Sequence, residues 1–334
     1  MSSEPRRPTL IDVARLAQVA PSTVSRALKE SPRISEATRL RVHAAARGLG
    51  YQPNRVAQSL RAKAAPFVGI VVPDIGITFY SRFVKGAQEV LEAAGYQALV
   101  MTTEREAGHE EAALRTLEGH QVTGILLATS RPESEEPEIP TVYFDSLAGE
   151  RGLAQIALAN DQGIELLVGH LAGHGHDRIG YIGGPPVFTS GRERLAGFRA
   201  AVARHGARRD AAYVEIADST WSPDSAAAAM TRLLALAEPP TAVVASGDTL
   251  AMGAIAACRA AGRRVPDGIA LVAFDDPVFG ALVDPPMTAL RRSDYELGRE
   301  AAHLLLEGLN GGVATPAVRL PVELVVRRSC GCPA

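Results

Sequence analysis

The sequence has 334 residues, which is too long for one small core, so two or three domains are expected. Hydrophobic residues make up 46% and charged residues 22%, as in globular proteins, and no run of about 18 apolar residues exists to span a membrane. No apolar run follows the first residues, so no signal peptide is expected, and three cysteines are too few for a disulfide framework. These features predict a cytoplasmic protein in a reducing compartment.

Charge is distributed unevenly along the chain. Residues 1–65 hold 12 Lys or Arg against 4 Asp or Glu, a net charge of +8, and the rest holds 23 against 33, a net charge of −10. A small cationic segment before a large anionic body is typical of a polyanion-binding module joined to a second functional unit.

The cationic segment has the pattern of three short helices. Thr9 and Asp12 have the spacing of a capping box, so a helix with an apolar stripe is expected over 10–17. The stripe comprises Leu10, Ile11, Val13, Ala14, Leu16 and Ala17. Further helices are expected over 21–29, where Pro21 suits the first position, and over 35–49. Two short helices joined by a tight turn and completed by a third form a helix-turn-helix domain.

The second of these helices has suitable residues for reading DNA. Arg26 can present a bidentate fork to a guanine edge, whereas Thr23 and Ser25 suit phosphate oxygens. The alternative is a surface helical hairpin with solvated arginines, and the net charge of +8 argues against it.

Three motifs in this segment resemble the headpiece of the lactose-repressor/galactose-repressor family. They are Thr9-Leu-Ile-Asp-Val-Ala, Thr23-Val-Ser-Arg-Ala-Leu and Arg47-Gly-Leu-Gly-Tyr-Gln-Pro-Asn-Arg-Val-Ala-Gln-Ser-Leu60. The resemblance implies that residues 54–60 form a hinge helix that folds on operator DNA and that Leu60 wedges into the minor groove. An apolar wedge of this kind unstacks and kinks a duplex. The alternative for Leu60 is an ordinary core leucine of a linker helix.

The resemblance also implies that the second and third residues of the recognition region, Pro21 and Ser22, are variable base-reading positions. The expected DNA-binding residues are Thr9, Pro21, Ser22, Thr23, Ser25, Arg26, Asn54, Arg55, Ala57 and Leu60. The family usually has Ser where this chain has Ala20, so the second helix lacks a side-chain cap worth about 1 kcal/mol. The operator sequence does not carry over from known members.

The remaining chain alternates short β-branched runs with Ala- and Leu-rich helical stretches. Strands are expected at Val68–Val72, Gln97–Thr102, Gly124–Ala128, Thr141–Phe144, Ile179–Ile182, Tyr213–Ile216, Ala242–Ala245 and Ile269–Phe274. Helices are expected at Tyr80–Ala94, His109–Leu117, Gln162–Leu171, Glu193–His205, Pro223–Leu236, Thr249–Ala261 and Tyr295–Leu309. This alternation predicts parallel sheets covered by helices, and eight strands divide into two sheets near Asn160.

The family resemblance continues through Arg178-Ile-Gly-Tyr-Ile-Gly-Gly184, Gly247-Asp-Thr-Leu-Ala-Met-Gly253 and Val272-Ala-Phe-Asp-Asp276. It implies an all-α helix-turn-helix headpiece followed by an α/β core of periplasmic-binding-protein type I, with two doubly wound subdomains. We expect a DNA-binding domain at 1–52, a hinge helix and linker at 53–65, and a core at 66–329. Within the core, the N-subdomain is expected to comprise about 66–160 and 291–318, and the C-subdomain about 161–290 and 319–329.

A ligand site is expected in the cleft between the subdomains, at the carboxyl ends of the strands. Asp74, Asp145, Asp248 and Asp275 follow strands there, and Arg194 begins a helix. Several acids with one fork-shaped donor suit a neutral polyhydroxylated ligand, and Trp221 can stack on a sugar face or a base. Family contacts fall at the positions of Phe79, Tyr80, Arg194, Trp221 and Asp275. The expected effector-binding residues are Phe79, Tyr80, Asp145, Arg194, Trp221, Asp248 and Asp275.

Each of these residues also has a structural interpretation. Phe79 and Tyr80 can fill the core at a helix start, and Arg194 can form a surface ion pair. Trp221 can serve subdomain packing, and Asp248 can cap its helix.

Other motifs predict neither metal nor cofactor binding. No second Cys/His pair with zinc spacing accompanies Cys330-Gly-Cys332, and the histidines His170, His174 and His176 include a routine family position. The segment Gly183-Gly-Pro-Pro186 lacks the dinucleotide fingerprint. The adjacent Asp275 and Asp276 point apart on a strand end, so they make a poor acid/base pair, and no enzyme activity is expected.

The sequence therefore predicts a regulator of transcription, typically a repressor. We expect it to bind a pseudo-palindromic operator in double-stranded DNA as a homodimer, with a sugar or sugar derivative as effector. Control of the same DNA-binding regulator by a purine or nucleoside, or by a protein partner, remains open. A free sugar-binding receptor would lack the cationic segment, and a sugar-processing enzyme would need a reactive constellation.

Overall fold

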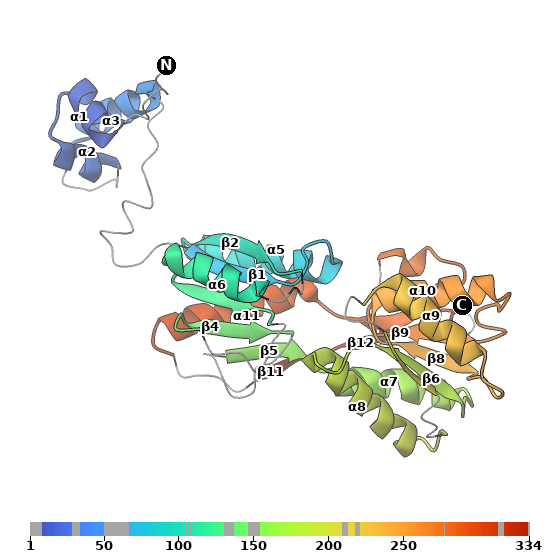
Figure 1. Ribbon diagram of the computed structural model, residues 1–334. Helices are drawn as coiled ribbons and strands as arrows, with labels where there is room; N and C mark the ends of the chain where they lie inside the picture. Colours follow the sequence, from blue (N-terminus) through green and yellow to red (C-terminus); the bar gives the residue numbers. More distant parts are fainter. Residues whose placement is uncertain are drawn as a thin grey trace. The chain divides into compact units, whose positions relative to one another are not determined.

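The computed structural model describes residues 9–28, 34–49, 67–104, 106, 108–129, 137–145, 154–208, 213–217, 221–276, 278–312 and 317–332 (Figure 1). The chain divides into two compact units, residues 1–65 and 66–334. Among the described residues, no helix has the length and apolarity needed to cross a lipid bilayer.

The first unit is built from three helices. They are α1 (Leu10–Ala17), α2 (Pro21–Leu28) and α3 (Glu36–Leu49). Their core consists of small apolar side chains, including Val13, Val24 and Val42. Ile11 and Leu16 of the expected stripe are instead 60% and 56% exposed. On so short a helix only positions 10, 13, 14 and 17 share the face toward the core, because they follow the helical spacing of three and four residues.

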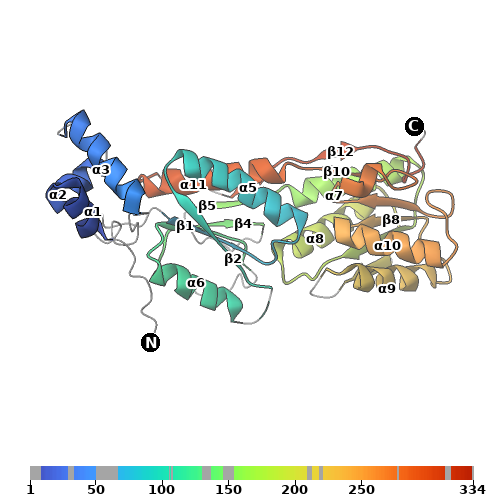
Figure 2. The same ribbon diagram turned by 90° about the horizontal axis from the view of Figure 1, so that it is seen from above.

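The second unit contains two six-stranded sheets, each with helices on both faces (Figure 2). The first sheet has the strand order β11-β5-β4-β3-β1-β2 and is entirely parallel. Its strands are β1 (Phe67–Val72), β2 (Gln97–Thr102), β3 (Gly124–Leu127), β4 (Thr141–Phe144), β5 (Ala154–Leu158) and β11 (Val318–Leu320). Helices α5 (Thr78–Ala93) and α11 (Asp294–Leu309) cover one face, and α6 (His109–Gly119) covers the other. We call this part the N-lobe.

The second sheet has the order β12-β10-β9-β8-β6-β7, and its edge strand β12 is antiparallel. Its strands are β6 (Ile179–Gly183), β7 (Val214–Ile216), β8 (Ala242–Ala245), β9 (Ala270–Ala273), β10 (Thr288–Arg291) and β12 (Glu323–Val325). Helices α7 (Asn160–Gly173) and α8 (Thr189–Arg204) pack on one face. Helices α9 (Pro223–Leu234) and α10 (Asp248–Ala260) pack on the other. We call this part the C-lobe.

The chain passes between the two sheets three times, after β5, after β10 and after β11. All eight expected strands are present, but the described residues form twelve, because β5, β10, β11 and β12 are not among the eight. The sequence of β5 is Ala-Gln-Ile-Ala-Leu, and Ala and Gln carry little strand preference. Strands β10 and β11 are four and three residues long, too short for an alternating pattern to stand out.

Two glycines bring α5 and α11 together. A Cβ atom at Gly86 would lie 2.0 Å from the carbonyl oxygen of Tyr295, and one at Gly298 would lie 2.0 Å from that of Phe83. The backbones of the two helices therefore touch, near the middle of α5 and the start of α11.

Candidate functional site

The exposed face of α2 offers the expected DNA contacts. Pro21, Ser22 and Arg26 are exposed and Thr23 is half-buried, while Val24 is buried in the core. No acidic residue occurs in α2. The Ser25 side chain and the expected hinge residues Asn54, Arg55, Ala57 and Leu60 lie outside the described residues, so their roles stay predictions.

Backbone hydrogen bonds cap the start of α2. The amides of Thr23 and Val24 donate to the carbonyl oxygen of Ala20 at 2.9 Å and 3.1 Å. Because Pro21 has no N–H group, the amide of Ser22 is the donor that this helix start can offer to a phosphate. Thr9 caps α1: its hydroxyl donates to Asp12 at 2.6 Å and the Asp12 amide donates back to it at 3.3 Å. Thr9 therefore orients α1, whatever else it contacts.

All seven residues expected to bind an effector line one pocket between the N-lobe and the C-lobe. The pocket has a volume of about 70 Å³. Its lining consists of Ile77, Phe79, Tyr80, Asp145, Ser190, Arg194, Trp221, Gly247, Asp248, Thr249, Asp275 and Arg292. Asp74 is absent from this lining, because its carboxylate accepts from the amide of Gly76 at 2.7 Å and closes a local turn.

Arg194 is a fully enclosed cation on α8, and the surface ion pair considered from sequence is wrong. It is 3% exposed, and its guanidinium donates to Asn160 at 2.8 Å and to the carbonyl of Ser246 at 2.6 Å. The guanidinium carbon also lies 3.6 Å from the ring centre of Phe274. Burial lowers the pKa of Arg194, and the nearby Asp275 opposes that change. These contacts hold the side chain in one orientation at the pocket wall.

Arg292 is a second enclosed cation that the sequence did not reveal. It follows β10, and its guanidinium pairs with Asp275 at 3.1 Å and with Asp294 at 2.8 Å. It also lies 4.4 Å from the ring centre of Phe79. Although burial opposes it, the charge of Asp275 and the other acids raises the pKa of Arg292. Had β10 been predicted, Arg292 would have counted among the residues at the carboxyl ends of strands.

The acids around these two arginines outnumber them. Asp145 accepts from the Tyr80 hydroxyl at 2.9 Å, and Asp248 accepts from the amide of Thr249 at 2.7 Å. Burial, followed by the charge of Asp275, raises the pKa of Asp248. Burial also raises the pKa of Asp294 to about 6, with Arg292 opposing it. Four acidic side chains, Asp145, Asp248, Asp275 and Asp294, thus surround two guanidinium groups.

Trp221 forms one wall of the pocket in a constrained backbone conformation. Its φ is +53°, a left-handed value that non-glycine residues seldom adopt. A Cβ atom at Gly184 would lie 2.0 Å from the Trp221 ring, so the indole lies directly against the glycine backbone. The buried indole N–H has no hydrogen-bond partner among the described residues. Trp221 thus contributes a fixed indole ring to the pocket wall.

The core interpretation of Phe79 and Tyr80 holds alongside the pocket, whereas the cap interpretation of Asp248 does not. Asp248 is the first residue of α10, whose N-cap is Gly247 without a side-chain cap hydrogen bond. Phe79 and Tyr80 are 6% and 4% exposed and belong to the N-lobe core, yet both line the pocket. As expected, the adjacent acids separate: Asp275 faces Arg292, whereas Asp276 forms a bidentate pair with Arg327 at 2.7 Å and 2.9 Å. A larger hollow of about 520 Å³ near Arg259 and Arg328 contains none of the expected residues.

Two motifs that sequence spacing treated separately meet in the C-lobe. The pair Cys330 and Cys332 lies beside His170 and His174 at the end of α7. The prediction that no second Cys/His pair accompanies the two cysteines is therefore wrong for the folded chain, because His170 and His174 are distant in sequence but adjacent in the structure.

Comparisons with known proteins cover both units. Residues 9–54 match the model of bacterial regulatory proteins of the lacI family, and residues 168–330 match a periplasmic binding protein-like domain. The chain is 33% identical over 328 residues to the HTH-type transcriptional repressor CytR of Escherichia coli K12, covering 96% of each protein. It is 36% identical over 339 residues to the HTH-type transcriptional regulator CelR of Thermobifida fusca, covering 97% of this chain and 98% of CelR.

Solved structures agree with these relatives. A lac repressor dimer bound to operator and the anti-inducer ONPF superposes with a TM-score of 0.87 at 27% identity, over 97% of this chain and 99% of that one. A CelR–cellobiose complex superposes with a TM-score of 0.73 at 33% identity, over 97% and 100%.

The fold and these matches define a transcription regulator that joins a helix-turn-helix unit to a periplasmic-binding-protein-like unit. The chain belongs to the LacI family of bacterial regulatory proteins. It is accordingly a DNA-binding regulator of transcription and not an enzyme.

Proposed function

We propose that this protein is a repressor that binds a pseudo-palindromic operator as a homodimer and responds to a neutral sugar in the pocket between its lobes. Residues 1–52 act as the DNA-binding domain and residues 53–65 as the hinge between DNA and core. Two-fold symmetry of the dimer matches the symmetry of the operator.

The convergence of charged and aromatic groups in one pocket carries the proposal. Carboxylates accept hydrogen bonds from sugar hydroxyls, and the guanidinium of Arg194 donates to hydroxyl or ring oxygens. With the carboxylates in excess, an anionic ligand would be repelled. The Trp221 ring can stack on the apolar face of a sugar, and the CelR relative was solved with cellobiose.

The position of the pocket links binding to movement. Its lining comes from both the N-lobe and the C-lobe, so a ligand that contacts both would favour one relative orientation of the two. We therefore expect ligand binding to shift the N-lobe relative to the C-lobe. In a dimer this movement changes the spacing of the two hinge segments and therefore the affinity for the operator. The coupling free energy between two such sites is typically about 1–3 kcal/mol.

The single tryptophan makes ligand binding directly measurable. Because Trp221 is the only tryptophan in the sequence and lines the pocket, intrinsic fluorescence reports on this site alone. We would titrate the full-length protein with cellobiose, glucose, ribose, cytidine and adenine, and record thermal unfolding in parallel. A neutral sugar is expected to change the emission and raise the unfolding midpoint.

A matched pair of variants tests the pocket itself. Asp275→Asn removes a carboxylate that faces the pocket, whereas Asp276→Asn removes its neighbour, which pairs with Arg327 outside it. We expect Asp275→Asn to weaken sugar binding at least about tenfold and to abolish the ligand response, with operator affinity unchanged, because a charge-assisted hydrogen bond is worth about 1.5–3 kcal/mol. Asp276→Asn is expected to keep the ligand response.

Other outcomes would overturn parts of the proposal. A response to cytidine or adenine, and to none of the sugars, would replace the sugar by a nucleoside or purine. No response to any small molecule would favour a protein partner. A normal ligand response in both Asp275→Asn and Arg194→Ala would remove these residues from the site.

A further inference from the structure

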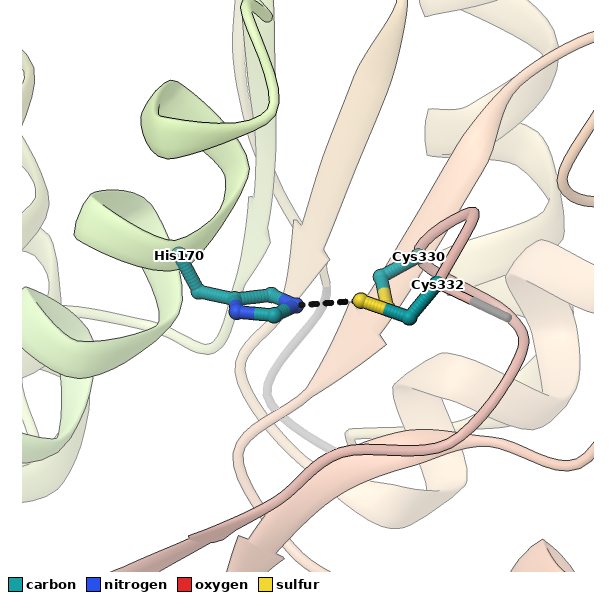
Figure 3. A group of neighbouring side chains, drawn as sticks. All are labelled: His170, Cys330 and Cys332. Carbon is teal, nitrogen blue, oxygen red and sulfur yellow. Dashed lines mark hydrogen bonds between the residues drawn. The ribbon is translucent and has the colours of Figure 1, made fainter. Parts of the chain in front are cut away.

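Two histidines and two cysteines from distant parts of the chain meet at the end of α7. His170 lies in the last turn of α7, and His174 is the residue that ends it. Cys330 and Cys332 flank Gly331 in the turn that follows β12. Figure 3 shows the two cysteine side chains and the His170 ring directed toward one another. This cluster lies within the C-lobe and contributes nothing to the pocket lining.

The distances between these side chains suit a small ion with tetrahedral ligands. The Cys332 sulfur lies 3.6 Å from Nε2 of His170 and 3.1 Å from Nε2 of His174. A ring nitrogen of His170 and the two sulfur atoms lie within 4.8 Å of one another. Zinc takes sulfur at about 2.3 Å and nitrogen at about 2.0–2.1 Å, which sets ligand atoms about 3.6 Å apart. Shifts of about 1 Å would therefore bring these three atoms to one ion. The His174 ring, whose centre lies 4.8 Å from that of His170, is near enough to supply a fourth ligand.

The Cys330 sulfur has two hydrogen-bond partners. It accepts from the Thr288 hydroxyl at 3.1 Å, a contact that a thiolate strengthens, and it donates to the carbonyl oxygen of Arg327 at 3.2 Å. Metal binding would release the thiol protons and replace the bond to Arg327 by a bond to the ion. A dication would cancel the charge of both thiolates.

We propose that His170, His174, Cys330 and Cys332 form a structural site for a thiophilic divalent cation, of which Zn²⁺ is the expected occupant. Four protein ligands close the coordination sphere, as in structural zinc sites. His174 is exposed, so the ion can enter from solvent.

The site would tie the turn after β12 to α7. The other end of this helix, about 21 Å away, holds Asn160, which accepts a hydrogen bond from Arg194 in the pocket wall. The ion would thus anchor the helix that supports the pocket, at its far end. Two competing interpretations are a Cys330–Cys332 disulfide and a purely hydrogen-bonded cluster.

Metal binding by the reduced protein is the direct test. Untagged full-length protein, purified with reductant and without chelator, would be analysed for bound zinc and titrated with Co²⁺. We expect about one equivalent of Zn²⁺ per chain. With Co²⁺ we expect the visible bands of a tetrahedral ion and a thiolate-to-cobalt charge-transfer band. Added Zn²⁺ is expected to raise the unfolding midpoint of the metal-free protein.

Variants assign the ligands. Cys332→Ser and His170→Ala are expected to weaken Zn²⁺ binding at least about 100-fold, because even the mutation of a residue that hydrogen-bonds to a metal ligand typically lowers metal affinity 10–100-fold. Competition with a chromophoric chelator measures the affinity. His176→Ala and Cys258→Ala are the matched controls. His176 bonds to Thr241 at 2.9 Å, and Cys258 lies in the core on the opposite face of the second sheet. Both are expected to bind Zn²⁺ as the wild type does.

Three results would overturn the proposal. The first is less than a tenth of an equivalent of zinc with no charge-transfer band in the reduced wild type. The second is unchanged Zn²⁺ affinity in both Cys332→Ser and His170→Ala. The third is a Cys330–Cys332 disulfide, seen by mass spectrometry, whose reduction yields no Zn²⁺ binding. None of these results depends on whether a sugar binds the pocket.

Discussion

At the scale of single residues, the pocket is built by side chains that restrict one another. The hydrogen bonds of Arg194 to Asn160 and to the carbonyl of Ser246 keep its side chain in one rotamer at the pocket before a ligand binds. The Trp221 ring packs directly on the backbone of Gly184, which only a residue without a side chain permits. Such pre-organisation lowers the entropy that ligand binding would otherwise cost.

Substitution of Gly184 tests this arrangement. In Gly184→Ala the new methyl group would overlap the Trp221 ring, so the indole must leave its position. We expect a red-shifted Trp221 emission, a loss of stability of about 1–3 kcal/mol and at least about tenfold weaker ligand binding.

Gly119→Ala is the control for the same chemical change, because a Cβ atom at Gly119 meets no atom within 4 Å. Fluorescence and thermal unfolding of both variants provide the measurement. Unchanged emission and stability in Gly184→Ala would show that the ring does not lie against this glycine.

At the scale of elements, α2 is a helix of eight residues that carries most of the proposed base-reading residues of the first unit. Its buried positions Val24 and Ala27 fix its orientation on α1 and α3, which leaves Ser22 and Arg26 exposed. Although Ala20 offers no side-chain cap, its carbonyl accepts the first backbone hydrogen bonds of the helix, from the amides of Thr23 and Val24. The face presented to DNA is therefore set by packing of the opposite face.

Variants at Arg26 and Leu60 test the proposed docking on DNA. Arg26→Ala is expected to weaken specific operator binding by about 1–3 kcal/mol, because a bidentate contact to a base is lost. Leu60→Ala is expected to weaken it severely through loss of the minor-groove wedge. Ligand affinity should stay at the wild-type level in both.

Arg41→Ala is the matched control, since it removes the same charge from the exposed surface of α3. Fluorescence anisotropy with DNA from the protein's own promoter region would report the affinities. Wild-type operator affinity in both Arg26→Ala and Leu60→Ala would show that the docking is wrong.

At the scale of the whole molecule, the unit proposed to bind DNA and the unit proposed to bind the effector carry opposite net charges. The 65-residue first unit has a net charge of +8 and the remainder −10. A dimer would bring two cationic units to one duplex while its anionic core is repelled by the phosphates. Only the first unit is then expected to bind DNA.

Salt dependence is the consequence that can be measured. Operator affinity is expected to fall by at least about 100-fold between 50 and 200 mM salt, because counterions are released from each phosphate that is contacted. Binding of a neutral sugar should change little over the same range. Titrations with operator DNA and with the sugar at several salt concentrations check this. Equal salt dependence of the two affinities would contradict the inference that the cationic first unit binds DNA and the anionic remainder binds the neutral ligand.

Much of the molecule could be predicted locally. The capping box of Thr9, the helical spacing of α1 and the alternation of apolar strands with helices depend on residues near one another in the chain. Arg292 could not be found this way, because it becomes a pocket residue only when β10 takes its place beside β9. The neighbours His170 and Cys332 are 162 residues apart, so no spacing rule relates them.

The sequence alone determined the described helices, eight of the twelve described strands, the charge of each unit and the family, because propensity, capping and motif spacing act over short stretches of chain. Tertiary structure decided which acids and arginines share the pocket, that Trp221 lies on Gly184, and that α7 meets the last turn of the chain. The pocket and the contact of α7 arise from the three passages between the sheets, and the contact of Trp221 with Gly184 arises from the pairing of β6 with β7. Both bring together side chains that no local interaction could align.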